Sequence, residues 1–336
     1  MTEVAKKICV IFQGQGGQEE GMGENLVKTH PEVATLYQQA SDILGYSPLN
    51  LTSEHLKSTA FVQPAVFTFN EACRIAFMKE RRGDEQIAYY AGNSLGELNA
   101  MLAAGAYNFE DGLNLVKARG LGMDFACAEY PSGLMALVGP SKFEGALFCL
   151  SARREFKRQA SHLLDGNGGG LFLEADNSLT QIVVGGTNEK LKQVQELFEE
   201  SGFSRRGFRL VRLNTAGAFH SDLMKPAEPF VKEALEKITL HDAKVPVIAN
   251  TTARPISRAG QMEQEITDHL TKPVLWRQSM DWVRRAQVTA IVELGKKDTL
   301  TKMMRDRGKI VATGAGLGIA AAGIAALLYF RNSKNH

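Results

Sequence analysis

The sequence predicts an α/β fold in which helices flank a mostly parallel sheet. Two short apolar segments, 8–12 and 87–91, have the length and composition of buried strands. A glycine-rich turn follows each of them, and helical patterns appear at 32–44 and 95–104. This alternation of strand and helix is typical of α/β proteins. A chain of 336 residues can form one large domain that carries a smaller insert.

The other elements are predicted from the spacing of apolar residues, which recurs about every 3.6 residues in a helix and every second residue in a strand. We expect further helices at 63–82, 109–129, 188–201, 224–237, 261–270 and 278–286. We expect further strands at 133–139, 181–186, 208–213, 245–249 and 288–294. The middle block mixes short strands with a helix and contains a flexible glycine turn at 165–170. We therefore predict a small inserted subdomain over 131–213, between the two parts of the main body, 1–130 and 214–307.

Composition excludes several classes of protein. The formal net charge is +2, so no strong positive field points to nucleic acid as a partner. The four cysteines are widely spaced, with no Cys-x-x-Cys pair and no Cys/His cluster at zinc spacing. We therefore expect free thiols in a reducing compartment and no metal site. The N-terminus has no apolar segment long enough for a signal peptide, which places the main body in the cytosol.

An uncharged segment lies near the C-terminus. Residues 310–330 contain no charged side chain, and as a helix they would span about 30 Å, the thickness of a bilayer core. Basic residues flank the segment on both sides, and Gly314 and Gly318 form a G-x-x-x-G step suited to close helix packing. We predict a C-terminal apolar helix within a transmembrane tail, 308–336, that anchors the body to a membrane. The alternative is a buried helix rich in alanine and glycine.

The strongest chemical signal is the pentapeptide Gly92-Asn93-Ser94-Leu95-Gly96. It follows a predicted strand and begins a predicted helix, which is the setting of a nucleophile elbow. The glycines allow a tight turn that exposes the serine hydroxyl near a helix N-terminus. A glycine-rich turn with a helix-capping serine is the alternative interpretation.

A serine nucleophile needs a base, and His220 is the best placed of the seven histidines. It lies in a loop between a predicted strand and a predicted helix, a position that suits a catalytic side chain. A histidine taken alone is more often an ordinary surface or core residue, so the surrounding sequence must decide.

Several motifs together resemble a known family. They are FQGQGGQ at 12–18, Gln63-Pro64-Ala65, the segment 92–120, AFHSDLMKPA at 218–227, Asn250, KPVLW at 272–276 and Glu-Leu-Gly at 293–295. In order and spacing, from about residue 8 to residue 305, the chain resembles the malonyl-CoA:acyl-carrier-protein transacylases. It is most similar to the free-standing acyltransferases of polyketide synthases. The resemblance implies an α/β-hydrolase-like core with a ferredoxin-like subdomain inserted over 131–213.

The resemblance also implies roles for individual residues. Ser94 would attack the thioester of malonyl-CoA while His220 takes its proton. A backbone carbonyl at His269, where the family usually has glutamine, would orient His220. The main-chain N–H groups of Gln15 and Leu95 would hold the oxyanion.

Two further matches concern the acyl group. Arg119 corresponds to the family arginine that binds the free carboxylate of malonyl, although a helix arginine taken alone is more often a surface residue. Phe219 before the histidine and Leu95 after the nucleophile form the pair that accompanies malonyl specificity in related domains. The phenyl ring fills the space that an α-methyl group would need.

The chain departs from the family pattern beside the nucleophile and after the last core strand. Asn93 replaces the histidine that normally precedes the serine, so we expect retained nucleophilicity and reduced or altered transfer. Gly295-Lys296-Lys297 replaces a Gly-Pro-Gly loop. The two lysines face solvent there, or they meet the phosphates of CoA or an acidic carrier protein.

The insert is longer than usual between about 145 and 172. Four basic residues lie there at helical spacing: Arg153, Arg154, Lys157 and Arg158. A solvated helix face, a docking face for an acidic carrier protein and a contact with anionic lipid are the three interpretations.

Three functions remain open from the sequence. The first is transfer of malonyl from malonyl-CoA to the phosphopantetheine thiol of an acyl carrier protein, in polyketide or fatty acid biosynthesis, with no cofactor. The second is an acyl hydrolase that clears stalled carrier proteins, although such relatives tend to lose the arginine that Arg119 matches. The third is a non-catalytic scaffold tethered to a membrane.

Overall fold

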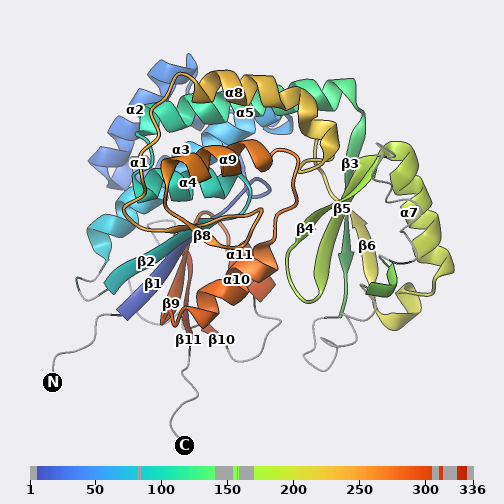
Figure 1. The fold of residues 1–336 in the computed structure, drawn as a ribbon. Helices are drawn as coiled ribbons and strands as arrows, with labels where there is room; N and C mark the ends of the chain where they lie inside the picture. The colour runs from blue at the N-terminus through green and yellow to red at the C-terminus, as the bar shows by residue number, and fades with distance from the viewer. Residues whose placement is uncertain are drawn as a thin grey trace, which may run out of the picture.

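The computed structural model describes residues 6–81, 83, 85–140, 154–156, 158, 170–304, 310–312 and 324–330. Two sheets organise these residues: a seven-stranded sheet in the main body and a four-stranded antiparallel sheet beside it (Figure 1). Helices cover the seven-stranded sheet, so the prediction of an α/β fold with a parallel sheet is confirmed.

The seven-stranded sheet has the order β10-β11-β9-β1-β2-β7-β8. The four strands β9, β1, β2 and β7 run parallel to one another and form its centre. The short β8 is antiparallel to β7, and β11 and β10 are antiparallel at the other edge. The bounds are β1 (Lys6–Phe12), β2 (Glu85–Gly92), β7 (Val247–Ile248), β8 (Pro255–Ile256), β9 (Ala290–Leu294), β10 (Ile310–Ala312) and β11 (Ile324–Phe330).

Alternate residues of β1 enter two different cores because successive side chains of a strand point to opposite faces. Ile8, Val10 and Phe12 pack into the larger core, under α2 to α5, α8 and α9. Cys9 and Ile11 pack into a second core under α10 and α11 on the other face. In Figure 1, α3, α4 and α9 lie above the strands, and α10 and α11 lie beside them on the right.

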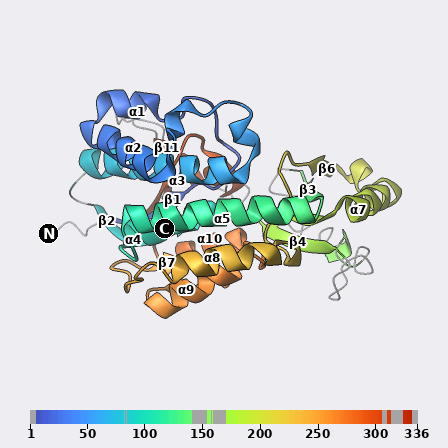
Figure 2. The same ribbon diagram turned by 90° about the horizontal axis from the view of Figure 1, so that it is seen from above.

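The helices of the main body are α1 (Glu24–Thr29), α2 (Pro31–Leu44), α3 (Thr59–Glu80), α4 (Leu95–Ala104), α5 (Phe109–Glu129), α8 (Glu228–Leu235), α9 (Ala259–Asp268), α10 (Trp276–Arg285) and α11 (Thr299–Met304). Short 3-10 turns are η1 (Pro48–Asn50), η2 (His55–Lys57) and η6 (Asp222–Ala227). Figure 2 shows α5 running across the main body toward β3 of the smaller sheet. One helix therefore links the two parts of the molecule.

The smaller sheet has the order β4-β5-β3-β6 and its own hydrophobic core. Its elements are β3 (Ser132–Val138), β4 (Leu171–Asp176), β5 (Gln181–Thr187), α7 (Asn188–Glu200), η5 (Ser204–Arg206) and β6 (Arg209–Arg212). The apolar face of α7 covers the sheet through Leu191, Val194 and Phe198, which share one side of the helix. Val274 N–H donates to the carbonyl of Glu174 at 2.8 Å, which fastens this sheet to the main body.

Most expected elements are present, with ends that shift by a few residues. The expectations missed β4, because its sequence LFLEAD carries two acidic residues that interrupt the apolar pattern of a buried strand. Of the predicted basic helix, Arg154 and Arg158 are helical, whereas Arg153 and Lys157 lie outside the described residues.

The prediction of an apolar helix over 310–330 is wrong for the part of that segment which the structure describes. Residues 310–312 and 324–330 form β10 and β11, and residues 313–323 lie outside the described part. β11 pairs with β9, whose edge would otherwise leave its N–H and C=O groups unpaired. A continuous apolar segment fits a buried strand as well as a helix, and its glycines weaken the helix.

None of the helices among the described residues is long and apolar enough to cross a membrane. The predicted transmembrane tail, the membrane as a partner and the tail anchor therefore find no support in the structure.

Candidate active site

The Ser94 elbow joins the end of β2 to the start of α4 at the centre of the parallel sheet. Ser94 has φ 51° and ψ −117°, a conformation that is rare for residues other than glycine. Such strain costs about 1–3 kcal/mol and persists only where neighbours hold it. A Cβ atom on Gly92 would lie 2.0 Å from the carbonyl carbon of Gly96, and one on Gly96 would lie 2.2 Å from the carbonyl oxygen of Phe12. Only glycine fits at both positions.

Asn250, which follows β7, holds the elbow from the neighbouring strand. Its Oδ1 accepts a hydrogen bond from the Ser94 N–H at 2.8 Å, and its Nδ2 donates to the carbonyl of Gly92 at 2.7 Å. The side chain therefore bonds the backbone on both sides of the turn. This asparagine is buried, so water does not compete for these contacts.

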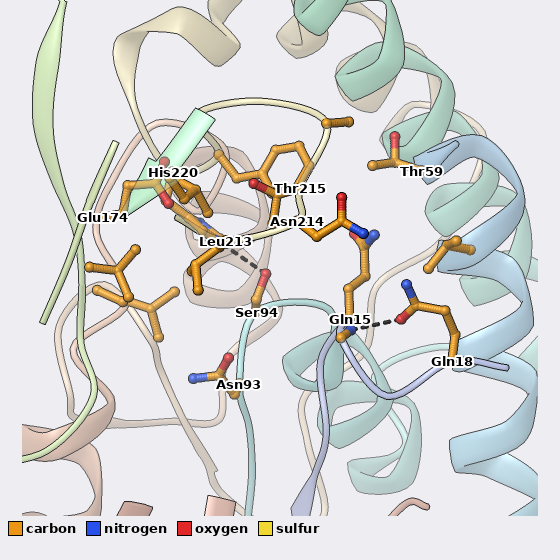
Figure 3. A pocket seen from close by; sticks show the side chains of 18 of the residues that line it. Gln15, Gln18, Thr59, Asn93, Ser94, Glu174, Leu213, Asn214, Thr215 and His220 are labelled. Atoms are coloured by element: carbon orange, nitrogen blue, oxygen red, sulfur yellow. Dashed lines mark hydrogen bonds between the residues drawn. The ribbon is translucent and has the colours of Figure 1, made fainter. Parts of the chain in front are cut away.

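His220 faces the serine hydroxyl. Its Nε2 lies 2.7 Å from Ser94 Oγ (Figure 3). Its Nδ1 lies 2.7 Å from the carbonyl oxygen of His269. Because a carbonyl can only accept, Nδ1 carries the proton and donates it to His269, which leaves Nε2 free to accept from the serine. His220 also has a positive φ of 56°.

The environment of His220 keeps the ring neutral. Burial and the nearby charge of Arg119 lower the pKa of His220 to about 3, although the hydrogen bond to His269 acts in the opposite direction. A neutral ring is the form that can take a proton from Ser94.

Arg119 reaches the site from the middle of α5. Its Nη1 donates to Gln63 Oε1 at 2.7 Å, and its Nη2 lies 3.5 Å from Ser94 Oγ. The side chain is 2% exposed, so its charge is little screened by water. Burial lowers the pKa of Arg119 to about 10, which still leaves the guanidinium charged at neutral pH. A buried cation beside the nucleophile is a ready partner for an anionic acyl group.

A pocket opens above Ser94 between the main body and the smaller sheet (Figure 3). Gln15 and Asn93 line it beside the serine, and Phe219 and Leu213 supply apolar wall. In the view of Figure 3, Glu174 and Gln18 lie on opposite sides of Ser94.

The predicted site residues thus divide by position. Ser94, His220, Gln15, Asn93 and Phe219 line the pocket. The side chains of Leu95, Arg119 and His269 are buried behind its wall.

The glycine-rich loop after β1 packs directly against the elbow. A Cβ atom on Gly14 would lie 2.5 Å from the carbonyl oxygen of Asn93, so the two turns touch through their backbones. Gln13 Nε2 donates to Glu293 Oε1 at 2.6 Å, which fixes the start of the loop. Lys296, one of the two unusual lysines, forms an ion pair with Glu19 of the same region.

Sequence reasoning missed several buried polar residues around the site. Glu97 accepts a hydrogen bond from Asn250 N–H, Glu265 accepts from Thr251 N–H, and Glu174 lies in the pocket wall. For Glu97 and Glu174 the available signal was an acidic residue inside a mostly apolar helix or strand. Glu265 lies in the largely polar helix α9, where an acidic residue does not stand out. Within the described ranges, no group of three or more His, Cys, Asp or Glu residues could hold a metal ion.

A serine on a strand–turn–helix elbow, paired with a neutral histidine that a main-chain carbonyl holds, defines a serine-nucleophile site in an α/β fold. The chain belongs to the acyl transferase domain family, which matches residues 9–320.

Known proteins of this family are similar over almost the whole chain. The polyketide biosynthesis protein ThaF of Burkholderia thailandensis is 32% identical over 328 residues, which cover 96% of this chain and 26% of ThaF. The chain therefore spans about a quarter of the length of that relative. The polyketide biosynthesis malonyl CoA-acyl carrier protein transacylase PksC of Bacillus subtilis is 32% identical over 303 residues, 88% of this chain and 96% of PksC.

Among solved structures, the malonyl CoA-acyl carrier protein transacylase from Burkholderia pseudomallei has the same fold. It superposes with a TM-score of 0.75 at 30% sequence identity, covering 89% of this chain and 96% of that one.

Proposed function

We propose that this chain transfers a malonyl group from malonyl-CoA to the phosphopantetheine thiol of an acyl carrier protein. The observation that carries the proposal is the position of Arg119, whose buried guanidinium lies 3.5 Å from the hydroxyl of Ser94. An acyl group on Ser94 that ends in a carboxylate would meet this cation. The relatives ThaF and PksC are named for polyketide biosynthesis, which supports that setting for the reaction.

The first half-reaction makes a malonyl ester of Ser94. Ser94 Oγ forms a bond to the thioester carbonyl carbon while its proton passes to His220 Nε2. The C–S bond then breaks, and CoA takes the proton from His220 and leaves as a thiol. No electrons are gained or lost, so the step needs no redox partner or cofactor.

The second half-reaction reverses these steps with a different thiol. The carrier-protein thiol gives its proton to His220, and its sulfur forms a bond to the malonyl carbonyl carbon. The ester C–O bond breaks, and Ser94 Oγ takes the proton back from His220. Because His220 is neutral, it can accept a proton from the attacking group in each half-reaction.

The oxyanion of each tetrahedral intermediate would bind the main-chain N–H groups of Gln15 and Leu95. Leu95 is the first residue of α4, where N–H groups have no acceptor within the helix. Gln15 lines the pocket on the loop that touches the elbow. A single such donor is typically worth about 3 kcal/mol of transition-state stabilisation.

The strand order supports the finer description of the fold. Counted along the insert, the smaller sheet runs second, third, first, fourth, which read backwards is the 4-1-3-2 order of a ferredoxin-like sheet. The parallel centre of the main sheet, with the elbow at the end of β2, supports an α/β-hydrolase-like core.

The experiment that tests the function uses radiolabelled malonyl-CoA and a phosphopantetheinylated carrier protein. We expect label on the carrier protein in the presence of the wild-type chain and none with Ser94→Ala. Label released as free malonate with none on the carrier would favour the acyl hydrolase instead. Absence of label on both protein chains would favour the non-catalytic scaffold.

A further inference from the structure

One buried carboxyl group lies behind both Ser94 and His220. Glu97 is in the first turn of α4, three residues after the nucleophile, and its side chain is fully buried. A carboxyl group in this position is costly, so the contacts that it makes must offset the loss of water.

The first path from Glu97 leads to Ser94. Glu97 Oε1 accepts a hydrogen bond from the main-chain N–H of Asn250 at 2.8 Å. The Asn250 side chain in turn accepts from the Ser94 N–H and donates to the Gly92 carbonyl. Glu97 therefore fixes the residue that holds both ends of the elbow.

The second path leads to His220. Glu97 Oε2 lies 3.3 Å from Nδ1 of His269, and both side chains are almost completely buried. His269 follows α9 directly, and its carbonyl oxygen is the acceptor for His220 Nδ1 at 2.7 Å. The rings of His220 and His269 also lie close, with centroids 4.7 Å apart. The contact with Glu97 therefore restrains the residue whose carbonyl orients His220.

Glu265 completes the cluster from α9. It accepts hydrogen bonds from the N–H and the hydroxyl of Thr251, and its charge acts on the carboxyl of Glu97. Burial, and next the charge of Glu265, raise the pKa of Glu97 well above its usual range. Burial also lowers the pKa of His269 well below its usual range, and the nearby charge of Arg119 adds to this. Burial therefore favours the uncharged form of Glu97 beside a neutral imidazole.

We propose that Glu97 is a positioning residue that holds the two strained residues of the site together, Ser94 through Asn250 and His220 through His269. Both Ser94 and His220 have positive φ angles, and such backbone persists only where surrounding contacts over-determine it. Glu97 does not touch the hydroxyl of Ser94 or the ring atom that accepts its proton. It acts by keeping those two atoms within hydrogen-bonding distance. This inference rests on the site described under the proposed function.

The test measures how fast a fluorophosphonate labels Ser94, because this reagent reports the Ser94–His220 pair without malonyl-CoA. Glu97→Leu keeps roughly the size of the side chain but removes both oxygens, the one that accepts from Asn250 and the one that faces His269. We expect labelling at least about ten times slower than in the wild type, with an unfolding midpoint that shows a folded protein. The matched control is Glu71→Leu, at a buried glutamate of α3 that pairs with Arg74 away from the site, which should label at the wild-type rate.

A second variant decides the matter if Glu97→Leu does not fold. His269→Leu keeps the main-chain carbonyl and removes the ring that Glu97 contacts, so we expect slower labelling of Ser94 as well. A labelling rate within about twofold of wild type in a folded Glu97→Leu or His269→Leu protein overturns the proposal. If wild type labels rapidly but transfers no malonyl, the proposed function fails while the positioning role still stands or falls on the labelling rates.

Discussion

Ser94 Oγ lies 2.7 Å from His220 Nε2, and both residues have a backbone φ above 50°. The two side chains come from loops 126 positions apart in the sequence. Two contacts that involve the backbone bring them together. The Asn250 side chain binds the N–H of Ser94, and the His269 carbonyl binds the imidazole of His220. The site is thus a serine–histidine pair in which a main-chain carbonyl, and not a carboxylate, orients the histidine.

The low pKa of His220 predicts an unusual pH profile. The ring of His220 acts as the base in its neutral form. The rate is therefore lost only as pH falls through the pKa of His220 in the folded protein, which is about 3. We therefore expect the rate of Ser94 acylation to change little between about pH 8 and about pH 5, well past the ordinary histidine pKa. Quenched-flow measurement of acyl-enzyme formation across this range checks it, and a half-loss of rate near pH 6.5 would contradict it.

Arg119→Ala tests the choice of acyl group. The buried guanidinium should bind the malonyl carboxylate by charge-assisted hydrogen bonds worth about 1.5–3 kcal/mol. We expect kcat/KM for malonyl-CoA to fall by about 10- to 100-fold, while acetyl-CoA, which has no carboxylate, loses much less.

The matched variant Arg119→Lys keeps a positive charge but lacks the planar fork, so it should restore only part of the malonyl activity. Equal losses for malonyl-CoA and acetyl-CoA would show that Arg119 supports the fold and does not select the acyl group.

Asn93→His tests the unusual neighbour of the nucleophile. Asn93 lines the pocket beside Ser94 and can form hydrogen bonds, but it cannot carry charge. We expect the variant to acylate at a similar rate and to change the ratio of transfer to hydrolysis of the malonyl ester. The measurement compares labelled carrier protein with released malonate for both proteins. An unchanged ratio would show that this position has no influence on transfer.

Glu174→Leu tests a buried carboxyl that has no hydrogen-bond partner for its Oε1 among the described residues. Burial raises the pKa of Glu174 well above its usual range, which keeps the group neutral. Because an unpaired buried polar group costs about 1–3 kcal/mol, we expect the leucine variant to unfold at higher urea concentration. Glu174→Gln, which stays polar, should gain less. A leucine variant less stable than wild type would mean that the carboxyl is paired in solution.

The elbow could be predicted from sequence because its signals are local. Gly92 and Gly96 are needed within five residues of each other, and the strand and helix around them follow simple periodicities. The fold class could be predicted from the sequence for the same reason, because the strands and helices also follow local patterns. Arg119 and the carbonyl of His269 became candidates only through resemblance to a family, because nothing near them in the sequence indicates that they meet. The loop position of His220 made it a candidate base, and the resemblance decided between that role and an ordinary histidine.

Contacts between distant segments explain what the sequence did not reveal. Glu97 meets Asn250 and His269 across more than 150 positions, and no local pattern encodes such a pairing. The strand β4 was missed because the buried Glu174 interrupts its apolar pattern. The segment 310–330 was misassigned because apolar composition alone does not distinguish a helix from strands that complete a sheet edge.

The central claim is that Ser94 carries the malonyl group between two thiols. Mass spectrometry of the intact protein after brief mixing with malonyl-CoA tests it most directly. We predict one malonyl adduct per chain, mapped to the peptide that contains Ser94, absent from Ser94→Ala and lost when a carrier-protein thiol is added. A protein that transfers malonyl to the carrier without an adduct on Ser94 would contradict the account.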